Sequence, residues 1–589
     1  MSAVDTAAEL GELYLGSIRP HNEKSMADRQ FKIDGLMRLP IHMVRKGEGI
    51  AAFVVLLGFV VTLQALGGAY TSGFGGNPDE AAHLVTSLMA QDFIAALDFR
   101  HPWQFAQQYY FHYPKVMIGI WPPVFYGALG IWFLIVDTSR GAAIMFIAIV
   151  AATTASVIYF TGKRLIGRWA GVLAAFLFLA SPLAQGSCAV VMLDYPATLA
   201  MLVSTLCFAR FARTGLIGDG LVFGTAAAAA ILTHGRAWAL GLVPGVTLAL
   251  TSRWYLLRRL GFWLAGIPVL IACVPWYIFT LNMLNGWTGD GVSFRAQAVA
   301  GFAWSIYLSA GLPVLIFALI GLWKTIIRVK PRAELAPEWA ALAGLAIATL
   351  LLCSVAPAPI DDRYMLPVLP SIALFSAAGV NEIAHRVGAR LPIRIVRAGL
   401  ALTLTAACCV ESFGLPLQLR NRGYDALVRD VMARVSDVPQ VWLISSGSIG
   451  EGCLVAAVAL QEARPISYVL RGKTILGGGD MLWRNMQDRF DTPAKLASLL
   501  DEIPVTIVVI DDRVPPGEHR PYQDRLRKLL ATESDRWEPI GSYPQIQGGM
   551  AFTNSLHVYA RRPVSSLTIT TPAIQLDRVR ALMVRNELR

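Results

Sequence analysis

Residues 141–160 read GAAIMFIAIVAATTASVIYF, a run of twenty residues without a charge. A run of this kind predicts an α-helix that crosses a membrane, because about 20 apolar residues span a hydrocarbon core of about 30 Å. The whole chain shares this character: 55% of its 589 residues are hydrophobic, only 15% are charged, and its mean hydropathy is +0.51. This composition excludes soluble, disordered and collagen-like proteins and predicts a polytopic α-helical membrane protein.

Similar apolar runs, uncharged except for Glu411 in the last one, recur along residues 49–416 and predict about eleven transmembrane helices. Residues 1–48 mix charges of both signs and lack the short apolar core and cleavage site of a signal peptide. We therefore expect a cytoplasmic N-terminal segment followed by an uncleaved first span. With loose boundaries, the predicted spans are 49–70, 141–160, 169–187, 195–209, 220–234, 237–251, 260–280, 305–323, 339–356, 364–381 and 398–416.

Residues 116–136 form a further uncharged run, but it contains two adjacent prolines, Pro122 and Pro123, which break a helix or hold it at an interface. Loop charges decide whether this run crosses, because cytoplasmic loops carry the excess of lysine and arginine. If it does not cross, the inner loops hold sixteen basic residues and the outer connections six, whereas crossing reverses the bias. We predict a juxtamembrane or re-entrant helix in the first outer loop. The inner loops are then 161–168, 210–219, 252–259, 324–338 and 382–397.

This arrangement has two consequences. The net charge of +11 is explained by the inner loops and needs no nucleic-acid partner. An odd number of spans also places the C-terminal segment outside the cytoplasm.

From about residue 417 the composition becomes that of a soluble α/β domain. Residues 441–444 and 505–510 are short β-branched runs typical of buried parallel strands, and residues 424–435 and 492–500 have helical spacing. We predict a small, doubly wound extracytoplasmic domain over residues 417–589, with a loosely tethered helix in the last 25 residues.

Two aspartates lie on the predicted outer face. Asp79 follows the first span in the sequence NPDE at 77–80, and Asp194 begins the fourth span in LDYP at 193–196. Each motif is explained by a capped helix start. A carboxylate held at a helix start is also suited to act as a general base for a hydroxyl group. The charge-based topology, built without reference to these acids, places both on one side of the membrane and so favours a shared site.

Candidate ligands for an anionic substrate lie in the same outer connections. Arg363 and Tyr364 occur in DDRYMLP at 361–367. An arginine can bind phosphate bidentately and a tyrosine hydroxyl can join it, although a surface Asp–Arg pair and an interfacial tyrosine explain the same residues. Lys115 and Arg236 are weaker candidates, because basic residues near span ends often only snorkel.

Six motifs, in this order, resemble the GT-C class of membrane glycosyltransferases, and within it the group of protein mannosyltransferases, the lipid A aminoarabinose transferase and rhizobial lipid A galacturonosyltransferases. The motifs cover roughly residues 49–384 and are PDE at 78–80, WPPVFY at 121–126, GKRLIGR at 162–168, LDYP at 193–196, THGR at 233–236 and RYMLP at 363–367.

The resemblance implies a GT-C-like catalytic domain over residues 49–416, a polyprenyl-phosphate sugar donor and an inverting hexosyl or pentosyl transfer on the outer face. It implies Asp79 as the base and Asp194 as a second acid. The acceptor is a lipid A-like lipid, a glycan or a protein of the cell envelope. We assign substrate binding to Glu80, His83, Lys115, Arg236, Arg363 and Tyr364.

Two positions depart from that group, which often has lysine where this chain has Trp121 and usually has lysine where this chain has His234. Binding of the donor phosphate therefore falls to Lys115, Arg236 or Arg363.

No cofactor is assigned. His83 and His112 leave a divalent metal open, but a lone histidine near an interface is more often only hydrogen-bonded, so no metal ligand is predicted. The seven cysteines have neither metal-ligand nor disulfide spacing.

Two other functions fit a protein with many spans. A transporter places ionisable groups near the bilayer midplane on interrupted helices, whereas almost every charge here lies at a loop or span end. In a non-catalytic envelope assembly protein the outer acids would only cap helices. Convergence of Asp79 and Asp194 on one outer cavity separates the transferase from these alternatives.

Overall fold

The computed structural model describes residues 46–74, 77–97, 99–117, 119–284, 295–356, 359–387, 392–414, 421–434, 439–478, 487–512, 514, 517–546 and 553–562. Most of the predicted N-terminal segment and the helix expected in the last 25 residues lie outside these ranges. The chain divides into two compact units, residues 1–55 and residues 56–589. The site and all contacts described below belong to the second unit.

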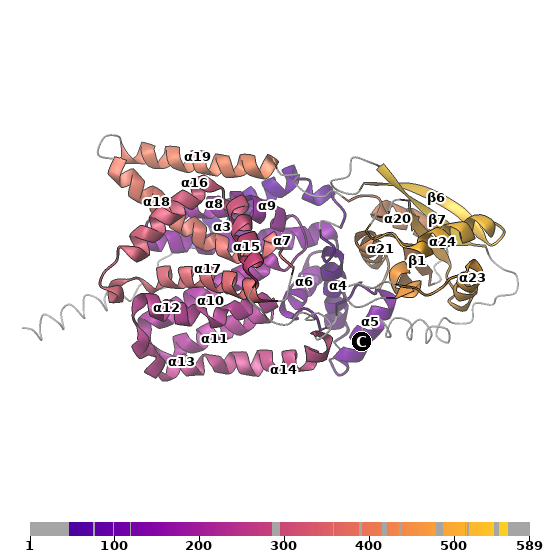
Figure 1. Cartoon of the computed structure of the whole chain (residues 1–589), viewed down its shortest axis with the longest axis horizontal. Helices are drawn as coiled ribbons and strands as arrows, with labels where there is room; N and C mark the ends of the chain where they lie inside the picture. Colours follow the sequence, from indigo (N-terminus) through magenta and orange to yellow (C-terminus); the bar gives the residue numbers. More distant parts are fainter. Residues whose placement is uncertain are drawn as a thin grey trace, which may run out of the picture. The chain divides into compact units, whose positions relative to one another are not determined.

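Helices account for nearly all regular structure up to residue 414 (Figure 1). In chain order the α-helices are α3 (Lys46–Leu66), α4 (Glu80–Ala96), α5 (Pro102–His112), α6 (Val124–Ile135), α7 (Arg140–Leu165), α8 (Arg168–Ala180), α9 (Pro182–Cys188), α10 (Asp194–Thr214), α11 (Ile217–Ile231), α12 (Val243–Thr251), α13 (Leu260–Leu264), α14 (Gly266–Leu284), α15 (Ala296–Ala310), α16 (Leu312–Leu322), α17 (Pro337–Val355), α18 (Leu369–Val387) and α19 (Ile393–Gly414). Two short 3₁₀ helices, η3 (Gly235–Gly241) and η7 (Asp362–Val368), precede α12 and α18.

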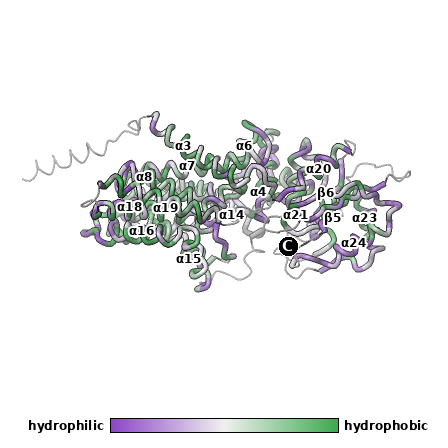
Figure 2. Tube along the Cα trace, turned by 90° about the horizontal axis from the view of Figure 1, so that it is seen from above, coloured by the Kyte–Doolittle hydropathy of each residue, from purple (hydrophilic) through white to green (hydrophobic). Residues whose placement is uncertain are grey.

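Among the described residues, six helical segments are long and apolar enough to cross a bilayer, and two bent helix pairs raise the number to eight. The six are Gly47–Leu66, Arg140–Leu165, Asp194–Thr214, Leu260–Thr280, Pro337–Val355 and Asp362–Val387. Figure 2 shows hydrophobic residues along these helices and more hydrophilic residues in the C-terminal segment. The chain is therefore a multi-pass membrane protein, as predicted, while the number of eleven spans remains a prediction.

Two predicted spans are broken rather than straight. The run at 305–323 is divided between α15 and α16, which meet at an angle of 104°. The break lies at Gly311, whose φ of 74° suits glycine, and is followed by Pro313, which has no N–H to donate. The run at 169–187 is likewise divided between α8 and α9, at 65°, where Pro182 begins the second helix.

The uncharged run at 116–136 forms only the twelve-residue helix α6. Twelve helical residues extend about 18 Å, which is shorter than a bilayer core of about 30 Å. The two prolines lie immediately before this helix, as its N-cap and the residue preceding it. A helix of this length cannot cross by itself and fits the expected juxtamembrane or re-entrant element.

Predicted inner loops meet at one end of the helices. Glu338 accepts hydrogen bonds from Arg213 and lies 3.3 Å from Arg164, so one carboxylate joins three of these loops. Lys324 and Glu382, at 3.0 Å, add a fourth. The ion pairs thus gather the loops that the charge argument assigned to one side of the membrane.

The C-terminal segment contains a five-stranded mixed sheet in the order β2-β1-β5-β7-β6. The strands β1 and β5, both expected from the sequence, pair in parallel with Leu443 opposite Val508, and β7 runs antiparallel to β5 and β6. The elements are α20 (Tyr424–Arg434), β1 (Val441–Ser445), α21 (Ser448–Gln461), β2 (Tyr468–Arg471), α22 (Gly472–Ile475), α23 (Pro493–Glu502), β5 (Ile507–Asp511), α24 (Pro521–Thr532), β6 (Trp537–Ile546) and β7 (Thr553–Arg561), with β3 (Gly477–Gly478) and β4 (Gln487–Asp488) forming a separate small ribbon.

This segment packs against the connection between α3 and α7, the predicted first outer loop. Helix α21 lies beside α4 (Figure 1). Arg464 forms an ion pair with Asp92 of α4 at 3.0 Å, and the ring of His112 in α5 stacks on Tyr468 of β2 with centroids 4.1 Å apart. Contacts of this kind tie the sheet region to the loop that carries Asp79.

Candidate functional site

A cavity of about 180 Å³ lies at the opposite end of the helices from the Glu338 cluster, bordered by the start of α4, the start of α10, η3, the end of α17 and η7. Six of the eight residues that the sequence assigned to the site line this cavity, from four separate segments. They are Asp79, His83, Asp194, Arg236, Arg363 and Tyr364.

Asp79 is presented by the turn that starts α4. The Asn77 Oδ1 atom accepts the N–H of Asp79 at 2.9 Å, so the asparagine caps this turn. The Asp79 side chain makes no capping hydrogen bond and instead lies with Oδ2 3.2 Å from Nη2 of Arg363. About a third of the carboxylate side chain is exposed (32%). Asp79 is therefore directed into the cavity rather than used to cap the helix.

Arg363 is held in place by the acid two residues before it. Asp361 accepts the backbone N–H of Arg363 at 3.2 Å and its Nε at 2.8 Å. The Met192 Sδ atom lies 3.9 Å from Nη1. Asp361 therefore belongs to the site, although the sequence suggested only a surface pair, and no sequence signal marks Met192.

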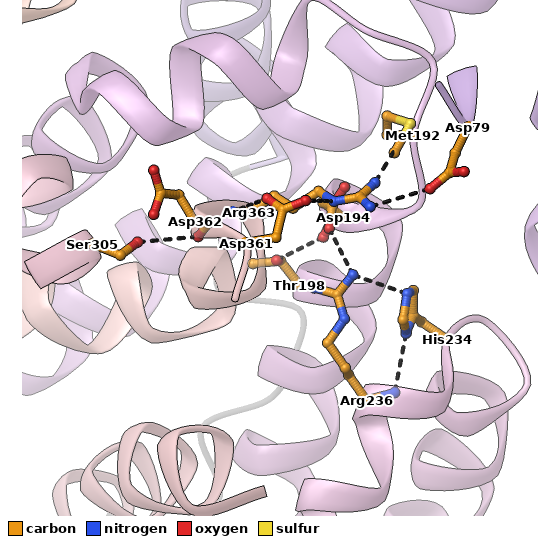
Figure 3. A network of polar contacts seen from close by, with 10 residues as sticks. All are labelled: Asp79, Met192, Asp194, Thr198, His234, Arg236, Ser305, Asp361, Asp362 and Arg363. Atoms are coloured by element: carbon orange, nitrogen blue, oxygen red, sulfur yellow. Dashed lines mark hydrogen bonds and ion pairs between the residues drawn. The ribbon is translucent and has the colours of Figure 1, made fainter. Parts of the chain in front are cut away.

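Asp194 forms the second aspartate–arginine pair. It is the first residue of α10, is almost fully buried, and lies with Oδ1 3.1 Å from Nη2 of Arg236. The guanidinium of Arg236 stacks over the Tyr364 ring, 3.7 Å from its centroid, and that of Arg363 lies 5.5 Å from the same centroid. Figure 3 shows the side chains of both pairs turned toward one another. Both guanidinium groups therefore lie next to the same aromatic ring, that of Tyr364.

His234, which replaces the lysine of the related group, also belongs to this network. Its Nδ1 accepts the backbone N–H of Arg236 at 3.0 Å. Nε2 lies 3.0 Å from Nη2 of Arg236. His234 therefore contacts both the backbone and the guanidinium of Arg236, a residue that lines the cavity.

His83 is buried and faces the cavity beside two aromatic residues. Its Nδ1 lies 2.9 Å from the hydroxyl of Tyr126, and its ring lies against Trp121, tilted by 47°, with centroids 4.2 Å apart. Burial, followed by the positive charges of Arg363, Lys115 and Arg236, lowers the pKa of His83 well below its usual value. His83 is therefore neutral at pH 7 and suited to hydrogen-bond a hydroxyl group rather than to bind an anion.

Two predicted site residues do not reach the cavity. Glu80 is fully buried and accepts hydrogen bonds from Arg140 at 3.0 Å and from the N–H of Val191 at 3.2 Å. Lys115 is 8% exposed and donates to the carbonyl of Pro78 at 3.2 Å. A helix turns by about 100° per residue, so the Glu80 side chain points away from the cavity that Asp79 faces. The structure does not support substrate binding by these two side chains.

Within the described parts of the chain, no group of three or more His, Cys, Asp or Glu side chains is placed to hold a metal ion. The two cavity aspartates are instead paired with arginines. The arginines can bind an anion and an aspartate can accept a proton within the same cavity.

Comparisons with known proteins concern the family and the fold of the chain. Residues 121–279 match a family model described as dolichyl-phosphate-mannose-protein mannosyltransferase. The fold matches the crystal structure of ArnT from Cupriavidus metallidurans in the apo state, with a TM-score of 0.56, 14% identity and coverage of 86% of this chain and 97% of that chain. The chain resembles the GT-C membrane glycosyltransferases, as predicted.

The structure of the same ArnT bound to undecaprenyl phosphate matches with a TM-score of 0.53 and 15% identity, covering 88% of this chain and 99% of that chain. No curated protein sequence matches the chain. The GT-C resemblance thus rests on the family model over the middle of the chain and on the fold over most of its length.

Proposed function

We propose that this protein is an inverting glycosyltransferase that moves a sugar from a polyprenyl-phosphate donor to an acceptor of the cell envelope, on the outer face of the cytoplasmic membrane. One observation carries the proposal: the pairs Asp79–Arg363 and Asp194–Arg236 face a single cavity. Transfer from a phosphate-linked sugar to a hydroxyl group requires a base and cationic phosphate ligands close together. The family model and the relative bound to undecaprenyl phosphate support the choice of donor.

The donor phosphate would bind between the two arginines. Both guanidiniums lie against the Tyr364 ring, so one phosphate can reach both of them. Hydrogen bonds between guanidinium and phosphate are charge-assisted and contribute about 1.5–3 kcal/mol each. His234 lies beside Arg236 and contacts it through both ring nitrogens.

The reaction would be a single displacement. The acceptor oxygen forms a bond to the anomeric carbon from the face opposite the phosphate, while the bond from that carbon to the phosphate oxygen breaks. The polyprenyl phosphate leaves with the electron pair, which the two arginines stabilise, and the acceptor proton passes to Asp79. Because the donor phosphate competes with Asp79 for Arg363, donor binding frees the carboxylate to accept that proton.

Asp194 and His83 would orient the reactants. Asp194 fixes Arg236 and orients the acceptor, or a metal if one binds. The neutral His83 ring, held by Tyr126 and Trp121, can hydrogen-bond a hydroxyl group of the sugar or the acceptor. The acceptor is a lipid A-like lipid, a glycan or a protein.

The outer location is supported by the two ends of the helices. Glu338 and Glu382 gather four predicted inner loops, whereas the aspartate–arginine cavity lies among predicted outer connections. On this topology the C-terminal segment 417–589 lies outside the cytoplasm, close to the site.

Deleting the gene and profiling envelope lipids and glycans by mass spectrometry tests the proposal. We expect one sugar-bearing product to disappear and the unused polyprenyl-phosphate sugar to accumulate. The wild-type gene and the exposed-residue variant Asp491→Asn should restore the product, and Asp79→Asn should not. An unchanged profile would contradict a transferase, and loss of the product without accumulation of the donor would favour an assembly protein.

A further inference from the structure

The peptide group between Pro78 and Asp79 is hydrogen-bonded at both of its ends. Its carbonyl accepts the ammonium of Lys115 at 3.2 Å, and its N–H donates to Asn77 Oδ1 at 2.9 Å. Lys115 comes from the far end of the first outer loop and is almost completely buried. The orientation of the turn that presents Asp79 therefore depends on a lysine outside the cavity.

Helix α21 of the C-terminal segment packs directly on this lysine. A Cβ atom placed on Gly452 would lie 2.9 Å from Cε of Lys115 and 3.2 Å from Cβ of Ala81 in the first turn of α4. The thiol of Cys453, the next residue of α21, donates to the carbonyl of Phe74 at 2.9 Å. One turn of α21 thus contacts the chain before Asp79, the chain after it, and Lys115.

Charged groups of both signs surround the buried ammonium of Lys115. Arg471 of β2 donates to the carbonyl of Pro114 at 3.2 Å and pairs with Glu451 of α21 at 3.1 Å. Burial and the charge of Arg471 lower the pKa of Lys115 to about 8, while Asp79 and Glu451 act in the opposite direction. At pH 7 most Lys115 side chains are therefore protonated, and the bond to the Pro78 carbonyl is charge-assisted.

We propose that Lys115 is a positioning residue for Asp79, and that helix α21 holds Lys115 in place. The inference rests on the proposed function, in which Asp79 is the base. Lys115 acts through the Pro78–Asp79 peptide group and does not touch the substrate. The C-terminal segment would then control the geometry of the base, and any change that moves α21 from α4 would loosen it.

Steady-state kinetics distinguish positioning from phosphate binding. Lys115→Met keeps the side-chain length but removes the charge and the donor. We expect kcat to fall about 10-fold and the donor KM to change less than about twofold, because a small misplacement of a reacting group is costly in turnover. A higher donor KM at unchanged kcat would show that Lys115 binds the phosphate, and unchanged values of both would also overturn the inference.

Gly452→Ala tests the part played by α21. The added methyl group can be accommodated only if the flexible end of Lys115 moves, so we expect a smaller fall in kcat. If Gly452 acts through Lys115, the double variant should be no slower than Lys115→Met alone. If the two substitutions lower kcat by factors that multiply in the double variant, Gly452 and Lys115 act independently, which would contradict the inference.

Hydrogen exchange gives a readout that needs no activity. The N–H groups of Asp79 and Glu80 bond to Asn77, and the N–H of His83 bonds to the Asp79 carbonyl, so their exchange reports on the turn. We expect Lys115→Met to speed their exchange about 10-fold. Lys495→Met, which removes an exposed lysine, should leave it unchanged.

Unchanged exchange at these amides would overturn the inference even if the transferase is active. An inactive wild-type protein would overturn the proposed function alone. If Lys115→Met lowers the melting temperature of the whole protein, the same exchange measurement is made on Gly452→Ala, which removes no group. Faster exchange at the Asp79, Glu80 and His83 amides in that variant would support the inference, and unchanged exchange would overturn it.

Discussion

The guanidinium of Arg363 lies 3.2 Å from the carboxylate of Asp79, although 284 positions separate the two residues in the chain. The pair brings together the turn before α4 and the 3₁₀ helix before α18. In the proposed reaction one member binds the leaving phosphate and the other accepts the acceptor proton. Donor binding and activation of the base are thereby connected through a single contact.

Arg363→Ala should mainly weaken donor binding. The loss of charge-assisted hydrogen bonds of about 1.5–3 kcal/mol corresponds to an increase in donor KM of roughly 10- to 150-fold. Arg363→Lys retains a charge but cannot reproduce the contacts with both Asp79 and Asp361, so we expect an intermediate KM. Steady-state kinetics with varied donor check this. Wild-type KM and kcat for Arg363→Ala would show that another residue binds the phosphate.

Asp194→Asn should affect the acceptor more than the donor. The substitution keeps the size of the side chain and removes the charge that fixes Arg236 and orients the acceptor. We expect kcat/KM for the acceptor to fall about 10- to 100-fold, the range typical of a lost charged contact at a reacting centre. Kinetics with varied acceptor measure it. A donor KM that rises by the same factor would assign Asp194 to the donor.

The C-terminal segment should lie outside the cytoplasm. The bias of sixteen basic residues over six fixes the orientation of the loops. A reporter that is active only in the cytoplasm, fused after Arg589, should therefore be silent in cells. Reporter activity there would reverse the topology and remove the argument for an outer site.

Helices α16 and α18 cross with their backbones in close contact. A Cβ atom on Gly321 would lie 1.8 Å from the carbonyl oxygen of Phe375, so Gly321→Ala must push the helices apart. We expect a loss of about 1–3 kcal/mol of stability and a lower melting temperature in detergent. Gly245→Ala is the matched control, because nothing lies within 4 Å of its added methyl group. Equal melting temperatures for the two variants would show that the crossing relaxes freely.

Much of the site could be predicted because its residues lie next to recognisable signals. Asp79 and Asp194 begin helices, and Arg363 directly precedes the apolar run 364–381, which contains most of α18. Loop charges alone predicted that the two aspartates share one side of the membrane, because these charges indicate which span ends lie together. Glycine and proline also mark the breaks at Gly311 and Pro182 in the sequence. The length of an uncharged run, however, does not show whether its helix is straight or bent.

Side-chain direction could not be predicted. Glu80 follows Asp79 directly, yet it points to Arg140, because one helical residue changes the direction by about 100°. Lys115 has the charge expected of a phosphate ligand but is enclosed by α21, a contact between segments more than 300 residues apart. Only the packing of the C-terminal segment determines where that charge lies.

Turnover of the Asp79→Asn variant is the most direct test of the account. Asparagine is nearly isosteric and cannot accept the proton, while Asn77 continues to cap the turn, so the protein should still fold and insert. General-base catalysis typically contributes about 10²–10⁴-fold, and we expect kcat to fall by that factor in a variant expressed at the wild-type level. Near-normal sugar transfer by this variant would contradict the assignment of Asp79 as the base.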